Sequence, residues 1–148
     1  METIFISYSH KDEDWKDRLV TQLQVLALEG HLETWDDRRI GAGEDWYSAI
    51  TQAMEKGGLA VFLVSANSLT SEFIRTEEIP RLLALRDAGK LRRLIPLVIK
   101  PCPWQTVEWL KKINLRPRDG KPLSSMGEAA AEEALAAFAM EIYQLTTK

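Results

Sequence analysis

The sequence predicts an α/β fold in which a parallel sheet is covered by helices on both faces. Short apolar runs rich in β-branched and aromatic residues alternate with longer segments whose apolar residues recur every three or four positions. One of these runs, residues 59–64, is apolar without interruption, as expected of a strand that is buried on both faces. The segments that join these elements are short, and strict alternation of strand and helix indicates parallel strands.

Each strand is identified by an apolar run between turn signals. The predicted strands are residues 3–8, 31–35, 59–64, 94–99 and a short fifth one, 113–115. Five strands favour a flavodoxin-like order over a larger dinucleotide-binding sheet.

The helices are predicted from apolar residues at helical spacing. Three such stripes are Trp15, Leu19, Leu23 and Leu26, then Trp46, Ile50, Ala53 and Met54, and finally Leu135, Phe138, Ile142 and Leu145. Residues 73–88 and 104–112 are also expected to be helical. Pro80 predicts either a kink in the first of these helices or a late start.

Length and composition favour one domain over residues 1–148, of a kind that suits the N-terminal part of a longer protein. The formal net charge of −3 indicates no attraction to nucleic acid or to an anionic membrane. The single cysteine excludes an internal disulfide, and the start of the chain does not resemble a signal peptide. We therefore expect a cytoplasmic protein.

Several enzyme templates are absent from the sequence. The Gly41-Ala42-Gly43 segment begins like a dinucleotide fingerprint, but Trp46 stands where the third glycine belongs. Neither a P-loop nor a serine-hydrolase elbow occurs. The two histidines lie on different predicted loops without a cysteine nearby, so we expect no metal site.

An aromatic residue and an acid are spaced by one helical turn after the third predicted strand. Phe73 precedes Glu77 by four residues, so both side chains should share one helix face at the rim where such sheets bind ligands. This pair would hold a ribose beneath a flat base. The adjacent Glu78 is expected to point to solvent or to a basic neighbour. Taken alone, both acids could simply favour a helix N-terminus.

Several segments, in register along the chain, give a family resemblance. Residues 5–12 with Trp15 resemble the opening box of a TIR (Toll/interleukin-1 receptor) domain, and residues 35–46 resemble its BB loop. Residues 64–77 resemble the strand and helix that carry the family's catalytic glutamate. Two further segments, 96–104 and 116–123, resemble bacterial members in particular.

The resemblance implies one of two functions. Some TIR domains cleave NAD⁺ at the nicotinamide–ribose bond, giving ADP-ribose or a cyclic isomer, and others act only as scaffolds. The presence of Glu77 favours an NAD⁺ nucleosidase with this residue as the catalytic carboxylate and no cofactor, NAD⁺ being the substrate. The other residues implied to meet the substrate are Phe73, Tyr8, Ser9, His10, Asp37, Arg38, Arg39 and Trp46.

The BB loop implies assembly with other TIR domains. Ile40 is apolar in a charged stretch, and Gly41 and Gly43 allow unusual backbone shapes. In the family this loop docks on a neighbouring TIR domain, and a repeated head-to-tail contact builds filaments. The implied setting is bacterial anti-phage immunity, with a fused or separate sensor domain as a further partner.

Overall fold

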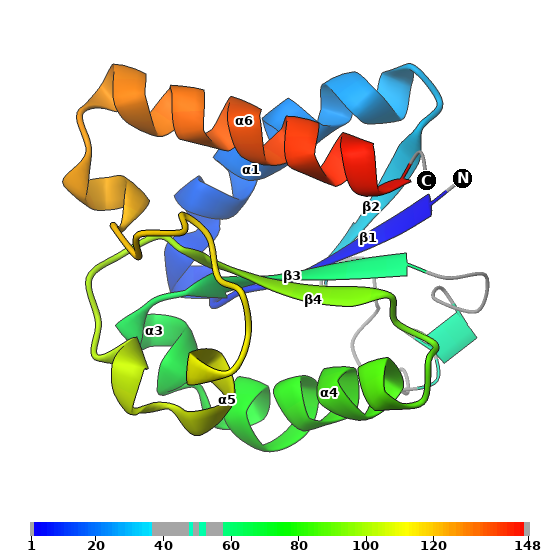
Figure 1. Cartoon of the computed structure of the whole chain (residues 1–148), viewed down its shortest axis with the longest axis vertical. Helices are drawn as coiled ribbons and strands as arrows, with labels where there is room; N and C mark the ends of the chain where they lie inside the picture. Colours follow the sequence, from blue (N-terminus) through cyan, green and yellow to red (C-terminus); the bar gives the residue numbers. More distant parts are fainter. Residues whose placement is uncertain (1, 37–47, 49–50, 53–57, 147–148) are drawn as a thin grey trace.

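Four parallel strands form one sheet in the order β2-β1-β3-β4 (Figure 1). A computed structural model of the chain describes residues 2–36, 48, 51–52 and 58–146. The strands are β1 (Glu2–Ser7), β2 (Leu32–Asp36), β3 (Gly58–Val64) and β4 (Arg93–Val98). Their predicted positions are confirmed to within one residue at each end, and the order is the flavodoxin-like one as far as these strands extend.

The predicted fifth strand at 113–115 is wrong, because within the described residues this segment contributes only one bridge to the edge of β4. The bridge pairs Leu97 with Arg116, which accepts a 2.8 Å hydrogen bond from the N–H of Val98 and donates one of 2.8 Å to the carbonyl of Pro96.

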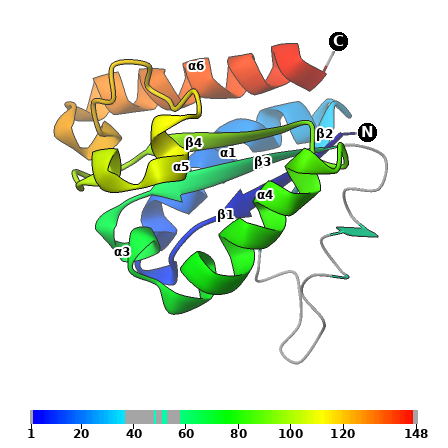
Figure 2. The ribbon, with the colours of Figure 1, turned by 60° about the horizontal axis from the view of Figure 1, so that its bottom comes forward.

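Helices cover both faces of the sheet, as predicted (Figures 1 and 2). The helices α1 (Glu13–Leu28) and α6 (Glu128–Thr146) pack on one face. The helices α3 (Ala66–Leu69), α4 (Ile79–Asp87) and α5 (Glu108–Lys111) lie on the other. Single 3₁₀ turns complete the described elements: η1 (His10–Asp12), η3 (Trp104–Thr106) and η4 (Leu123–Ser125).

Two predicted helices differ from the structure or lie mostly outside it. Residues 104–112 are divided between η3 and α5, with Val107 extended between them. Most of the helix predicted around 46–54 lies outside the described residues, although Ser48, Thr51 and Gln52 are helical.

The core has two layers because successive strand side chains point to opposite faces. All of β3 is buried: Leu59, Val61 and Leu63 pack on the α1/α6 side, while its even-numbered residues pack on the α4 side. A strand buried on both faces is what the uninterrupted apolar run predicted. No helix of the described residues is long and apolar enough to span a bilayer.

The helix predicted over residues 73–88 is helical from residue 72, so it does not start late at Pro80; instead its hydrogen bonding is irregular just before this proline. A wide π-helical turn, η2 (Ile74–Glu78), comes first, and the N–H of Ile79 bonds to the carbonyl of Ile74. The α-helix α4 begins at Ile79, so Pro80, which has no N–H to donate, lies directly after the wide turn.

Candidate functional site

A cavity of about 420 Å³ opens where the chain leaves β1 and where it turns after β3. Tyr8, Ser9 and His10 line one side of this cavity, and Phe73 lines the other. The structure thus brings together four of the residues that the sequence predicted to meet the substrate. Lys11, Ser71 and Ile74 complete the lining and were not predicted. The position confirms that side chains gather beyond the carboxyl ends of the strands.

The aromatic residues differ in how firmly they are held. Tyr8 is buried, and its hydroxyl donates a 3.0 Å hydrogen bond to Oε2 of Glu13. Its ring centroid lies 5.6 Å from that of His10 and 5.5 Å from Nζ of Lys16. Phe73, by contrast, is 44% exposed. A fixed ring on one wall and an accessible ring on the other suit a cavity that takes up a flat ligand.

The two adjacent glutamates do not lie as the sequence predicted. Glu78 was expected to point to solvent, and this prediction is wrong: Glu78 is fully buried, and the hydroxyl of Ser7 donates a hydrogen bond to its Oε1. Glu77 has a side chain that is 54% exposed and lies 4.0 Å from Nη2 of Arg81. Neither glutamate lines the cavity, but Ser7 is the residue immediately before Tyr8.

The wide turn explains this exchange of positions. The prediction assumed α-helical geometry, in which residues four apart share a face. In η2 the bonds run from one residue to the fifth after it, so the turn is wider than an α-helical one and the side chains after it are rotated relative to Phe73. Glu78 follows Phe73 by five residues, and it is Glu78 that faces the end of β1.

Asp12 joins the ends of three strands just behind the cavity. Its carboxylate is buried and accepts bonds of 2.7 Å from Nζ of Lys100 and 2.9 Å from Nδ2 of Asn67, together with one from the hydroxyl of Ser65. Ser65 follows β3, and Lys100 lies just after β4. Since Asp12 ends the η1 turn that carries His10 and Lys11, this cluster fixes one wall of the cavity.

The charge of Asp12 follows from its partners. Burial alone would raise the pKa of this carboxyl, but the hydrogen bonds from Lys100, Ser65 and Asn67 outweigh burial and hold the pKa below its usual value. This cluster was not predicted from the sequence. Its one signal was an acid and a lysine that each follow the end of a predicted strand, since such ends meet at one edge of a parallel sheet.

The remaining predicted site residues lie outside the described part of the chain. They are Asp37, Arg38, Arg39 and Trp46 for the substrate, and Ile40, Gly41 and Gly43 for assembly. Within the described residues, no group of three or more histidine, cysteine or acidic side chains is arranged to hold a metal ion.

Comparison with known proteins decides the family. A model of the TIR domain matches residues 4–133. The chain belongs to the TIR domain family. This TIR domain is also 39% identical over 124 residues to the uncharacterized protein y4lF of Sinorhizobium fredii (strain NBRC 101917 / NGR234). The match covers 84% of the TIR domain but spans only 38% of the length of that relative.

One solved structure of TIR domains agrees with the fold. The TIR domain superposes on the TIR domains of the activated Roq1 resistosome, which directly recognizes the pathogen effector XopQ, with a TM-score of 0.52 at 19% identity, covering 94% of this chain and 84% of that one. The TIR domain of the Toll-related receptor TRR-2 from Hydra magnipapillata gives a TM-score of 0.45 at 15% identity, over 70% of this chain and 78% of that one.

Proposed function

We propose that this TIR domain is an NAD⁺ nucleosidase that cleaves the nicotinamide–ribose bond, releasing nicotinamide and leaving ADP-ribose or its cyclic isomer. The observation that supports it best is the cavity at the carboxyl ends of β1 and β3, where the accessible ring of Phe73 faces Tyr8, Ser9 and His10. A buried carboxylate, Glu78, is held directly beside this wall by Ser7.

The reaction needs few groups from the protein. Nicotinamide in NAD⁺ is already a cationic leaving group, so its departure requires no general acid. The transition state resembles an oxocarbenium ion, whose positive charge one fixed carboxylate stabilises. Phe73 would stack on the nicotinamide ring, and the hydroxyls of Tyr8 and Ser9 with the His10 ring would meet the ribose or phosphate.

The carboxylate in this proposal is Glu78 rather than the Glu77 predicted from sequence. Glu77 is exposed to solvent and lies beside Arg81, so its negative charge would not act on a ligand in the cavity. Glu78 reaches the ribose by exchanging its hydrogen bond with Ser7 for one with a substrate hydroxyl.

The direct test is to incubate concentrated protein with NAD⁺ and to separate the products by chromatography. Equal release of nicotinamide and of ADP-ribose or a cyclic isomer supports the proposal, and the ratio of the two products distinguishes hydrolysis from cyclisation. NAD⁺ that stays intact at high protein concentration contradicts it and favours the alternative in which the TIR domain is a scaffold.

Phe73 gives a prediction on substrate affinity. Stacking on a base contributes roughly 1–3 kcal/mol, so Phe73→Ala should raise the KM for NAD⁺ by about tenfold or more, while Phe73→Trp should preserve it. Because Phe73 is 44% exposed, the loss of its ring should change the free energy of unfolding little. Kinetics and chemical denaturation of both variants measure the two effects, and an unchanged KM in Phe73→Ala would exclude stacking.

We further propose that the active form is an assembly of TIR domains, in line with the implied role of residues 36–45. Activity per molecule should then rise steeply with protein concentration, and Gly43→Val should remove the rise by restricting the backbone. Specific activity over a dilution series, with light scattering alongside, measures this. A monomer with a flat activity profile would instead indicate a self-contained site.

The setting that we propose is bacterial immunity, in which a fused or separate sensor domain triggers NAD⁺ loss in the cytoplasm. A relative that is more than twice as long as the matched region supports the presence of further domains in such proteins.

A further inference from the structure

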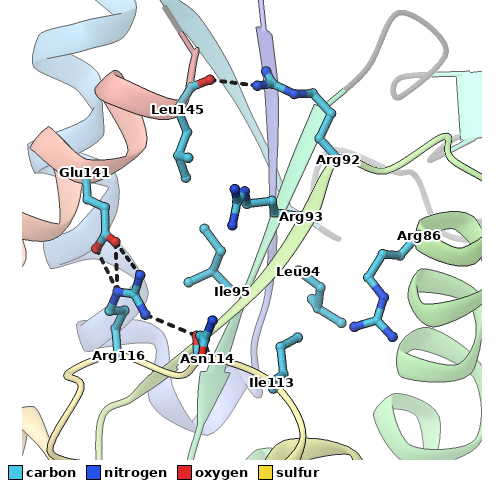
Figure 3. Close-up of a pocket in the computed structure, with 10 residues that line it drawn as sticks. All are labelled: Arg86, Arg92, Arg93, Leu94, Ile95, Ile113, Asn114, Arg116, Glu141 and Leu145. Atoms are coloured by element: carbon cyan, nitrogen blue, oxygen red, sulfur yellow. Dashed lines mark hydrogen bonds and ion pairs between the residues drawn. The ribbon is translucent and has the colours of Figure 1, made fainter. Parts of the chain in front are cut away.

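Arginines gather around a second hollow, far along the sheet from the cavity. This hollow of about 300 Å³ lies at the amino end of β4, whereas the cavity lies beyond the carboxyl ends of β1 and β3. Arg86 reaches it from α4, Arg92 from just before β4, Arg93 from the first position of β4, and Arg116 from the segment after α5 (Figure 3). The one acidic side chain in its described lining is Glu141 of α6.

The carboxylate of Glu141 is already paired with Arg116. Nε of Arg116 donates to Oε1 of Glu141 at 2.9 Å and Nη2 donates to Oε2 at 2.5 Å, so the pair is bidentate. The hydrogen bonds from Arg116 and the positive charges of Arg118 and Arg93 hold the pKa of Glu141 below its usual value. Glu141 therefore stays ionised and compensates Arg116, and the positive charge of the other arginines remains.

The other arginines differ in how many contacts they already make with neighbouring groups. Arg92 donates hydrogen bonds to the carboxylate of Glu2 and, at 2.9 Å, to the carbonyl of Leu145 (Figure 3). Arg86 lies 3.6 Å from the exposed carboxylate of Asp87, a contact that solvent weakens. Arg93 forms no ion pair within the described part of the chain, and its side chain lies centrally among the arginines in Figure 3.

The sheet edge contributes a backbone donor to the same place. The groups of Pro96 and Val98 that bond to Arg116 point away from β3, so the two-residue alternation of a strand turns the N–H of Leu94 outward as well. Leu94 lines the hollow. A guanidinium group can donate two parallel hydrogen bonds to the oxygens of one phosphate, which a lysine ammonium group cannot do. An outward backbone N–H beside it adds a further donor.

We propose that this hollow is an anion site that binds a phosphate chain, such as a pyrophosphate or triphosphate group, with Arg93 and Arg86 as its principal contacts. Its volume is at the lower limit for ligand pockets, so a phosphate chain fits inside while any attached nucleoside projects from it. The site is separate from the proposed NAD⁺ cavity and does not depend on the proposed activity.

Calorimetric titration of the chain with inorganic pyrophosphate and triphosphate, at constant ionic strength and against sulfate, tests the site. We expect saturable binding with one site per chain, weaker for sulfate, and reduced by about tenfold or more in Arg93→Gln and in Arg86→Gln. Arg75→Gln, which removes the same charge from the exposed surface of η2, should leave the affinity unchanged. Parallel titrations with ADP and ATP show whether a nucleoside adds to the affinity.

Two results would overturn the proposal. One is the absence of saturable binding, or an equal loss in Arg75→Gln, which would indicate only general attraction between charges. The other is unchanged phosphate affinity in Arg93→Gln together with lost self-association by light scattering, which would make the hollow a contact with a second copy. Because Arg93 and Arg86 are partly or fully exposed, both variants should fold, and thermal unfolding curves check this.

Discussion

Glu78→Gln is expected to abolish NAD⁺ cleavage, with a fall in kcat of at least about a hundredfold, while Glu77→Gln keeps most of the activity. The amide retains the shape of the side chain and can still accept a hydrogen bond from Ser7, but it carries no charge to stabilise an oxocarbenium ion. Nicotinamide release measures the rate, and chemical denaturation of each variant shows that the protein being assayed is folded.

Ser7→Ala is the matched control for this prediction. This substitution removes the hydrogen bond that the Ser7 hydroxyl donates to Glu78, but it leaves the carboxylate of Glu78 in place. Substantial activity in folded Ser7→Ala, beside an inactive Glu78→Gln, assigns the loss to the charge. If instead Glu77→Gln is inactive and Glu78→Gln active, the four-residue spacing read from the sequence is the correct one.

The largest effect on stability is expected for Lys100→Met. Asp12 would remain buried without the ammonium group that bonds to it at 2.7 Å. Breaking a buried pair costs about 3–5 kcal/mol, and because the Lys100 side chain is 36% exposed we expect about 2–3 kcal/mol of unfolding free energy. Lys111→Met is the control, since its pair with the exposed Glu108 should contribute at most about 0.5 kcal/mol.

The pH dependence of stability separates the charge of Asp12 from its packing. Because the folded-state pKa of Asp12 lies below the unfolded one, its contribution is complete above roughly pH 4 and is lost as the pH falls through the folded value. Denaturation between pH 2.5 and 6 should therefore show the parent gaining stability over Asp12→Asn as the pH rises. A constant difference between the two over this range would contradict an ionised Asp12.

Patterns within one segment predicted the sheet well. The run 59–64 alone indicated a central strand, and the alternation along β3 divides its residues between two apolar layers. The family resemblance, rather than these patterns, implied that Tyr8, Ser9 and His10 meet the same ligand as Phe73, and the four residues line one cavity.

The sequence failed where geometry departs from regular periods or where partners are far apart. No residue pattern from Phe73 to Glu78 predicts a π turn. With this one wider turn, Glu78 is buried and Glu77 is exposed, the reverse of what the sequence predicted. Asp12 lies 53 residues from Ser65 and 88 from Lys100, so their contact depends on the completed sheet. The predicted fifth strand was wrong, since a three-residue apolar run does not by itself show whether a segment pairs beyond a single bridge.

Arg92 has a consequence for how the domain can be attached to other molecules. By binding Glu2 in β1 and the carbonyl of Leu145 in α6, it fastens the beginning and the end of the described fold together at the amino ends of the strands (Figure 1). The cavity opens at the opposite ends of β1 and β3. A tether, reporter protein or surface linked through either terminus is therefore attached at the amino ends of the strands, and the mouth of the cavity at the opposite ends stays unobstructed.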